Sequence, residues 1–414
     1  MKFGIKTLDD FELKGKTVLM RVDINEPINH EDGTLNDITR IEGCLPTIKE
    51  ISDAGAKLVL MAHQGSGIEY ENFYTTAPHA KVISKLLGRE IKFVADVAGP
   101  TAVQAIKDLG VGEILLLDNV RFLNEEDTLF EKALRLSHKE QADTLLIRNL
   151  APLGDIYVND AFAATHRDQP SLCAFQQILP SAMGRLFEKE YEVISELIEN
   201  PAKPCVFVLG GSKISDAFLM MESVLAKGAA DHVLTGGLVG QVMNWAAGVN
   251  IGKDSKDFIT AKGFVELVPL AKDLLDKYGD KIVRPVDGAH VIDGKRFDVD
   301  FDHIVETESL MDIGAETAKL YSQIIADAKT VFVNGPMGVF EKEVTQLGTK
   351  TVFDALGSTA GYTVIGGGDS ITASKKYDVA DKIDYVCTAG GALIRFLSGE
   401  ELPVVKALKE GATK

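Results

Sequence analysis

The chain has 414 residues, of which 45% are hydrophobic and 25% are charged, and its formal net charge is −17. This length predicts two or three folded domains, and the negative charge argues against non-specific binding to nucleic acid. No apolar run reaches the ~18 residues that span a bilayer, and the N-terminus has no apolar signal core, so we expect a cytoplasmic protein without a membrane partner.

Short β-rich apolar runs alternate with helical patterns along the chain. We expect strands at residues 17–24, 57–63, 113–120, 155–162, 205–211, 232–237, 330–336, 362–368 and 385–391. Because these runs are apolar over their full length, both faces of each strand should be covered, as in parallel sheets. Residues 79–88 and 216–228 repeat apolar positions at i, i+3 and i+4, which is typical of helices that connect parallel strands. The charge cluster at 81–93 is interpreted as a solvated face.

A change in composition divides the chain. Eight of the eleven arginines precede residue 186, whereas 25 of the 38 glycines follow residue 200. Residues 181–200 place Glu and Lys opposite an apolar stripe, and two prolines stop the pattern. We therefore expect a linker helix over 181–200 between two domains, 1–180 and 201–396, rather than a helix inside one large sheet.

The four cysteines are far apart in the sequence and form no C-x-x-C pair. Mostly apolar residues flank each of them, which predicts buried free thiols in a reducing compartment. Neither the cysteines nor the histidines show the spacing of a zinc site.

Polar side chains gather around the ends of the strands expected in the first half. In open parallel sheets, ligands bind beyond the carboxyl ends of the strands. Arginine binds carboxylate and phosphate groups through paired hydrogen bonds, so several arginines here indicate a small substrate with more than one anionic group. A single arginine is usually a surface residue, and a single histidine is usually structural. The residues concerned are Arg21, Asp23, Asn25, His63, Arg121, Asn159, Asp160, His166 and Arg167, with Arg40 opening a helix on the same side.

Glycines follow the strands expected in the second half, in LGGSK, TGGL, NGPMGVFE, GGGDS and TAGG. Glycine lets backbone N–H groups approach a phosphate closely, and a helix N-terminus adds a favourable dipole. One glycine triplet alone would indicate a tight turn, but the repeated pattern favours a nucleotide. The triplet at 366–368 would receive phosphates, and Asp369 would hold a divalent cation that screens them. Lys213 would add a point charge, and Glu341 is a candidate acceptor for ribose hydroxyls.

Several familiar motifs are absent. The sequence has no G-x-x-x-x-G-K-[ST] loop, and no G-x-G-x-x-G follows the first strand. A Walker-type phosphate loop is thereby excluded, and a nicotinamide dehydrogenase is disfavoured. The tripeptide at 166–168 reads His-Arg-Asp but lacks the downstream Asn and the D-F-G of a protein kinase.

Taken in order, eight segments resemble the phosphoglycerate kinase family: RVDINEP, AHQGS, LDNVRF, VNDAFAATHR, LGGSKISDA, VNGPMGVFE, IGGGDS and TAGGA. The likeness covers nearly the full length. It implies reversible phosphoryl transfer between 1,3-bisphosphoglycerate and MgADP, giving 3-phosphoglycerate and MgATP, in glycolysis and gluconeogenesis. It also implies an α/β fold of two Rossmann-like, three-layer αβα lobes with parallel sheets, joined by a hinge helix, with residues 397–414 returning to the first lobe.

The resemblance assigns residues to each role. Phosphoglycerate would be bound by Asp23, Asn25, Arg40, His63, Ser66, Arg121, His166 and Arg167. The nucleotide would be bound by Gly210, Gly211, Lys213, Gly237, Asn334, Glu341, Gly366, Gly367, Gly368, Asp369 and Ser370, with Mg²⁺ on Asp369. After lobe closure, charge stabilisation without a general base would come from Arg40, Lys213 and the backbone near Gly367 and Gly390. The protein is expected to be a monomer or a homodimer.

Some positions depart from the family pattern. Ser66 follows Gly65 where an arginine is usual, which puts one substrate-phosphate contact in doubt. Ala217 stands where many members carry a second lysine after Lys213. Val333 replaces a common Trp and Ala389 replaces a glycine, and with the HQG wording these features look closer to the archaeal branch.

Three alternatives remain open at this point. A kinase of other small carboxylates or sugars would share the nucleotide lobe. A two-lobed small-molecule binding protein would share the lobes and hinge but bind no nucleotide. A non-catalytic family member would explain Ser66 and Ala217.

Overall fold

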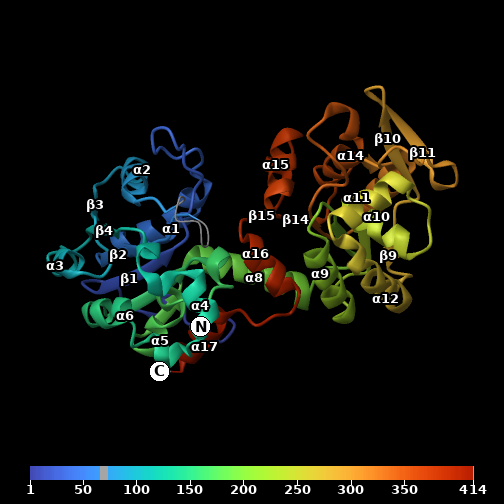
Figure 1. The fold of residues 1–414 in the computed structure, drawn as a ribbon. Helices are drawn as coiled ribbons and strands as arrows, with labels where there is room; N and C mark the ends of the chain where they lie inside the picture. Colours follow the sequence, from blue (N-terminus) through green and yellow to red (C-terminus); the bar gives the residue numbers. More distant parts are fainter. Residues whose placement is uncertain (66–72, 414) are drawn as a thin grey trace. The chain divides into compact units, whose positions relative to one another are not determined.

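The computed structural model describes residues 1–65 and 73–413, and the chain divides into two compact units (Figure 1). The N-terminal unit consists of Met1–Glu192 and Glu401–Lys414, and the C-terminal unit consists of Val193–Glu400. Each unit is built on a parallel sheet with connecting helices, which confirms the predicted α/β fold class.

The sheet of the N-terminal unit is parallel and has the strand order β3-β4-β2-β1-β5-β6. Its strands are β1 (Thr17–Val22), β2 (Lys57–Met61), β3 (Ile91–Val94), β4 (Ile114–Leu117), β5 (Ile156–Asp160) and β6 (Ser181–Met183). Its helices are α1 (Thr39–Asp53), α2 (Ala77–Leu87), α3 (Pro100–Lys107), α4 (Thr128–Leu134), α5 (His138–Gln141), α6 (Leu145–Leu150), α7 (Pro170–Cys173) and α17 (Pro403–Ala412).

Both faces of this sheet are buried because alternate residues of each strand point to opposite sides. In β1, Val18 and Met20 belong to one apolar core, whereas Leu19 belongs to the other. In β2, Leu58 and Val59 divide in the same way. The uniformly apolar runs of the sequence are thus explained by a sheet with a core on each face.

The C-terminal unit has a parallel sheet of order β15-β14-β13-β7-β8-β9 and a separate antiparallel sheet of order β11-β10-β12. The strands are β7 (Cys205–Leu209), β8 (His232–Thr235), β9 (Ile282–Val283), β10 (Asp287–Ile292), β11 (Lys295–Asp300), β12 (Asp312–Ile313), β13 (Thr330–Asn334), β14 (Tyr362–Gly366) and β15 (Tyr385–Cys387). The helices are α9 (Ile214–Ala226), α10 (Gly237–Ala246), α11 (Lys253–Ala261), α12 (Val268–Tyr278), α13 (Ala315–Asp327), α14 (Leu347–Leu356), α15 (Gly368–Lys376) and α16 (Gly390–Leu397).

Every strand expected from the sequence is present, but each ends two to four residues earlier than expected. Many of the residues beyond these ends are glycines or polar residues, which favour turns over continued strand pairing. Two predictions were wrong in part. Segment 81–93, interpreted as a solvated face, has Ile83 and Ile91 buried, and Ile91 begins β3. Residues 181–183 of the expected linker helix form β6, because they pair with β5.

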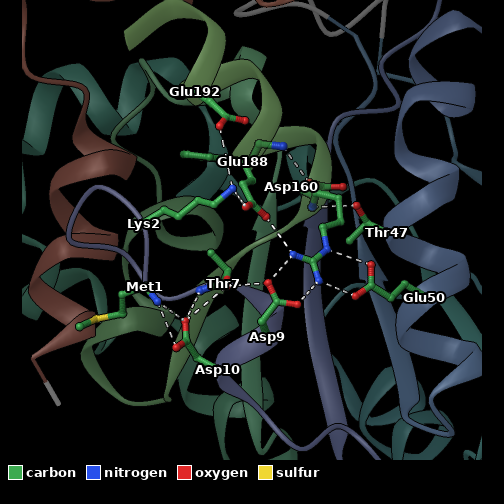
Figure 2. A network of polar contacts seen from close by, with 12 residues as sticks. Met1, Lys2, Thr7, Asp9, Asp10, Thr47, Glu50, Asp160, Glu188 and Glu192 are labelled. Atoms are coloured by element: carbon green, nitrogen blue, oxygen red, sulfur yellow. Dashed lines mark hydrogen bonds and ion pairs between the residues drawn. The ribbon is translucent and has the colours of Figure 1, made fainter. Parts of the chain in front are cut away.

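Helix α8 (Arg185–Glu199) follows β6, and the boundary between the two units falls inside it. Its first turn is bound to the N-terminal unit through Arg185, whose guanidinium contacts Asp9 at 2.6 Å, Glu50 at 2.7 Å and Glu188 at 2.9 Å. Figure 2 shows these three carboxylates converging from separate elements. Hydrogen bonds to Glu50 and Asp9 raise the pKa of Arg185 despite partial burial.

The end of β5 holds the same turn from the other side. The carboxylate of Asp160, which is labelled in Figure 2, accepts a hydrogen bond from the amide of Phe187 at 3.0 Å. Asp160 is fully buried, and burial raises its pKa to about 7. The first turn of α8 is therefore fixed by both a charged network and a buried carboxyl group.

The C-terminal helix α17, red in Figure 1, packs against β6 and α7 of the N-terminal unit. The amide of Val404 donates to the carbonyl oxygen of Thr165 at 3.3 Å, and Val404 and Leu408 are fully buried. Across residues 1–65 and 73–413, no helix is both long and apolar enough to cross a membrane.

We predict that Arg185→Ala frees the first turn of α8 by removing paired hydrogen bonds to two carboxylates, at a cost of about 1–3 kcal/mol in local opening free energy. Native-state hydrogen exchange at the Phe187 amide measures this cost. Lys253→Ala is the matched control, because it removes an exposed i,i+4 pair with Asp257 that contributes little. Unchanged exchange at Phe187 in the Arg185 variant would contradict the assignment.

Candidate functional site

The first group of candidate residues lies around the ends of β1 and β2 and along α1. Arg40, in the first turn of α1, donates to the buried carboxylate of Asp23, which follows β1. Glu26 accepts from the amide of Arg40 at 2.7 Å and from that of Ile41 at 3.1 Å. Glu26 thereby supplies acceptors for the helix start, where the side chain of Ile38 makes no cap. Arg40 is held in place through both its backbone and its side chain.

Asn25 and Arg121 meet at the loop after β2. The Asn25 side chain accepts from the amide of Gly65 at 2.9 Å, and Arg121 donates to the carbonyl oxygen of the same glycine. Burial, together with the charges of Arg21 and Arg167, lowers the pKa of Arg121 to about 10. The predicted ligand Ser66 lies outside the described residues.

His63 stands at the centre of the positive charge. It is 8% exposed, and Arg21 donates to its Nδ1 atom at 3.1 Å. Burial lowers its pKa well below the usual value, and the charges of Arg121, Arg21, Arg40 and Arg167 lower it further. Because guanidinium is only a donor, Nδ1 must accept, and a neutral ring then carries its proton on Nε2. His63 is thus a neutral donor surrounded by cations.

Arg167 and His166 follow β5 and its short 3₁₀ turn. Arg167 donates to the hydroxyl of Thr128 at 3.3 Å and lies 3.8 Å from the carboxylate of Glu131. Its side chain remains 27% exposed, and His166 is also partly exposed. Arg167 acts electrostatically on both His63 and Arg121, so the structure brings it together with the other predicted anion ligands.

Two buried charged residues support this cluster: Arg21, which the sequence placed among the polar residues near the strand ends, and Glu126, which it did not reveal. Arg21 lies within β1, is 1% exposed, and donates to Ser171 at 2.9 Å. Glu126 is fully buried and accepts from the amide and the hydroxyl of Ser171, both at 2.6 Å. Burial raises the pKa of Glu126 to about 7. A glutamate in the polar stretch NEED carries no signal of burial, and nothing in the sequence could have identified it.

In the C-terminal unit, the glycines after β7 and β8 serve close chain crossings. The amides of Gly210, Gly211 and Gly237 donate to the carbonyl oxygens of Asn334, Pro336 and Met337 at 2.7–2.9 Å. A Cβ on Gly210 would lie 2.2 Å from the carbonyl oxygen of Pro336. The expectation that these amides face a phosphate is therefore not met here, because carbonyl groups of the β13 loop already take them.

The start of α15 offers donors instead. Gly367 precedes the helix with a φ of 86°, and within the described residues no hydrogen bond uses the amides of Gly368, Asp369 or Ser370. The hydroxyl of Ser370 accepts from the amide of Gly335 at 2.8 Å. Free amides at a helix N-terminus favour anions, so the start of α15 is the candidate phosphate site of this unit.

Gly366 and Gly390 have other settings. A Cβ on Gly366 would lie 2.2 Å from a methyl carbon of Leu393 on α16, so this glycine permits helix packing. Gly390 begins α16 with a φ of 48°, and its own Cβ position is open. Asn334, at the end of β13, points its Oδ1 atom at the Cβ position of Gly367, 2.5 Å away.

A cavity of about 370 Å³ lies beside these loops. Its wall includes the predicted residues Gly211, Gly237, Glu341 and Asp369. Much of the remaining lining is apolar, from Leu238, Phe258, Leu310, Met311, Val339 and Phe340. An apolar wall with a few polar groups suits a planar base and its ribose.

Two charged candidates complete this site. Lys213 immediately precedes α9, is exposed, and has no ion-pair partner among the described residues. Ala217, one turn further on, is 3% exposed and faces the interior. Asp369 is exposed in the first turn of α15. A single carboxylate beside free amides fits Mg²⁺ bound mainly by phosphates and water.

We predict that His63 stays neutral and protonated on Nε2 between about pH 6 and pH 8, since burial and guanidinium charges oppose protonation. In the unfolded chain, His63 takes up a second ring proton near pH 6.5. The contribution of His63 therefore lowers the unfolding free energy as pH falls below that value. Long-range ¹H–¹⁵N correlation spectra of the folded and the urea-unfolded protein measure the protonation. Titration of the assigned His63 imidazole near pH 6.5 in the folded protein would contradict this prediction.

Substitutions at two neighbouring glycines distinguish a strained backbone position from an unstrained, open one. Gly367→Ala should cost about 1–2 kcal/mol, because φ is left-handed and the new Cβ meets Asn334. Gly368→Ala should change stability by less than about 1 kcal/mol, since no atom lies within 4 Å of its Cβ position. Urea unfolding followed by the single tryptophan, Trp245 on α10 of the same unit, compares them. Equal losses would show that the Gly367 conformation is not required.

Comparison with known proteins identifies the family of the chain. The family model described as phosphoglycerate kinase matches residues 8–400. The phosphoglycerate kinase of Methanothermobacter thermautotrophicus is 46% identical over 99% of this chain and 98% of the relative, and that of Thermococcus kodakarensis is 41% identical over 97% and 96%. The crystal structure of the Pyrococcus horikoshii enzyme superposes with a TM-score of 0.88 at 38% identity, covering 99% of this chain and 100% of that one. The chain belongs to the phosphoglycerate kinase family.

Proposed function

We propose that the chain catalyses reversible phosphoryl transfer between 1,3-bisphosphoglycerate and MgADP, giving 3-phosphoglycerate and MgATP. Family membership supports the reaction. The observation that carries it within the structure is the positive charge around the neutral His63, which Arg21 contacts at 3.1 Å and on which Arg40, Arg121 and Arg167 act electrostatically. A compact acid with anionic groups at both ends would be electrostatically complementary to this cluster of positive charge.

The N-terminal unit would bind the three-carbon acid. Arg121 and Arg167 offer guanidinium groups to one anionic end, and His63 donates a hydrogen bond from Nε2. Arg40, held by Asp23 and Glu26, would contact the carboxyl or the moving phosphoryl group. The missing arginine at Ser66 leaves these residues to bear the phosphate contact.

The C-terminal unit would bind the magnesium nucleotide. The base and ribose would occupy the 370 Å³ cavity with Glu341 on its wall, and the phosphates would meet the free amides of α15. Asp369 would hold Mg²⁺, whose charge screens the phosphates. Lys213 lacks a described ion-pair partner and would follow the phosphates as a point charge.

The transfer itself would need little covalent chemistry from the protein. Its transition state is loose and highly charged, so fixed donors and cations lower its energy by position alone. The leaving group towards ADP is a carboxylate, and no general base is required in that direction. Arg40, Lys213 and the backbone near Gly367 and Gly390 are proposed to stabilise the moving group.

The two sets of ligands belong to different units, so in-line transfer requires closure about α8. Closure would also exclude water, which otherwise hydrolyses the acyl phosphate. We further propose a cytoplasmic location, because all four cysteines are free and buried, as in reducing compartments. A monomer or homodimer remains the prediction for assembly.

A coupled assay with 3-phosphoglycerate and MgATP tests the proposal together with the role of Arg40. Arg40→Ala should lower kcat by about 10²–10³-fold, as loss of a transition-state donor does, while the Kd for ADP stays nearly unchanged. Arg89→Ala is the control, because Arg89 pairs with Asp53 at the far end of α1. No activity in the unmodified protein would contradict the function, and equal loss of ADP binding would contradict the role of Arg40.

A further inference from the structure

One cluster of metal-ligand types stands apart from the proposed reaction. His138 begins α5, Asp168 follows Arg167, and Cys173 ends α7. One ligand atom from each lies within 4.8 Å of the other two, and the described residues contain no second such group of three. The separations of 30 and 5 residues match no zinc pattern in sequence, so only the fold brings these side chains together.

The two ring nitrogens of His138 face two carboxylates. Nδ1 lies 3.2 Å from Glu410 on α17, and Nε2 lies 3.5 Å from Asp168. A neutral ring has one N–H, so a ring that donates to Glu410 turns a lone pair towards the Asp168 carboxylate. The same Asp168 oxygen accepts from Nε2 of Gln141 at 2.6 Å, and a second ring proton or a metal ion on that side would add to this contact.

The distances are compatible with a metal ion. The Nε2–Asp168 separation of 3.5 Å exceeds the 2.7–3.2 Å of ordinary N–H···O bonds. Two ligand atoms each about 2.0 Å from a tetrahedral ion stand about 3.3 Å apart. The Cys173 sulfur completes a face of nitrogen, oxygen and sulfur, and in the ion-free structure it lies 3.6 Å from the carbonyl oxygen of Arg167.

We propose that His138, Asp168 and Cys173 bind one Zn²⁺ ion, with water as the fourth ligand. Mixed nitrogen, oxygen and sulfur donors suit zinc. Glu410 would fix the ring tautomer through Nδ1, as carboxylates do for metal-bound histidines. Asp168 is 38% exposed and Glu410 is 42% exposed, which gives the ion a path from solvent.

Binding has a defined proton balance. The S–H bond of Cys173 breaks and an S–Zn bond forms, and any proton on Nε2 of His138 leaves as the N–Zn bond forms. Both protons pass to the solvent, and no redox partner takes part. Burial raises the pKa of the Cys173 thiol, so the ion must drive its deprotonation.

The ion would connect segments that are distant in sequence. It would join α5 to α7 directly and to α17 through Glu410, and Cys173 also lies beside the backbone of the substrate candidate Arg167. The site would therefore stabilise the N-terminal unit around its returning C-terminal helix. The inference does not rest on the proposed reaction.

The test uses the full-length protein, stripped with EDTA, without nucleotide, and titrated with Co²⁺ as a spectroscopic probe. The proposal predicts a near-ultraviolet thiolate-to-cobalt band that saturates at one equivalent, is displaced by Zn²⁺, and is accompanied by a rise in Tm. An oxygen site at Asp369 cannot produce this band, because the band requires sulfur.

Variants assign the ligands. Cys173→Ser should abolish the band, His138→Gln should weaken cobalt binding at least tenfold, and Glu410→Gln should weaken it by about tenfold. Cys205→Ala is the matched control, since Cys205 is a buried thiol in the other unit. Glu410 is 42% exposed, and His138, although its side chain is only 11% exposed, starts the four-residue helix α5, so circular dichroism should show folded variants. Absence of the band, or a band that survives both Cys173→Ser and His138→Gln, would overturn the proposal.

Discussion

Repulsion among guanidinium groups is the constraint on which the N-terminal site depends. Burial keeps His63 neutral, and the charges of Arg21, Arg40, Arg121 and Arg167 add to this effect. Such a cluster is stable only where carboxylates offset part of the charge. Asp23 bonds Arg40, Glu131 lies near Arg167, and Glu126 acts on Arg21. The remaining positive charge is available to an anionic substrate.

In the C-terminal unit, the backbone rather than charged side chains shapes the candidate site. The loops after β7 and β8 lie so close to the loop after β13 that Gly210 has no room for a Cβ. The amides of these glycines donate hydrogen bonds to carbonyl groups at the end of β13 and in the loop that follows. The crossings leave the N-terminal amides of α15 as the donors that face outward. Glycine therefore shapes the site in two ways. It lets two loops of the same unit cross closely, and it leaves the start of α15 accessible.

The sequence predicted the parallel strands well, because a sheet with cores on both faces requires uninterrupted apolar runs. It did not predict the antiparallel sheet, because β11 is mostly exposed and reads as polar. It selected Arg40, His63, Arg121 and Arg167 as candidate ligands through their positions near strand ends and in family motifs, and their binding roles stay a prediction. It missed the support from Glu126 and the cluster around His138, because burial of a polar residue and contact between distant segments arise only from tertiary packing.

The central claim is a division of labour, in which side-chain cations of one unit bind the acid and backbone donors of the other bind the nucleotide. A crystal structure with 3-phosphoglycerate and MgADP bound tests this most directly. The account predicts guanidinium contacts from Arg40, Arg121 and Arg167 to the acid, ADP phosphates on the amides of residues 368–370, and the metal ion on Asp369. Phosphates distant from α15, or an acid that contacts none of these arginines, would contradict it.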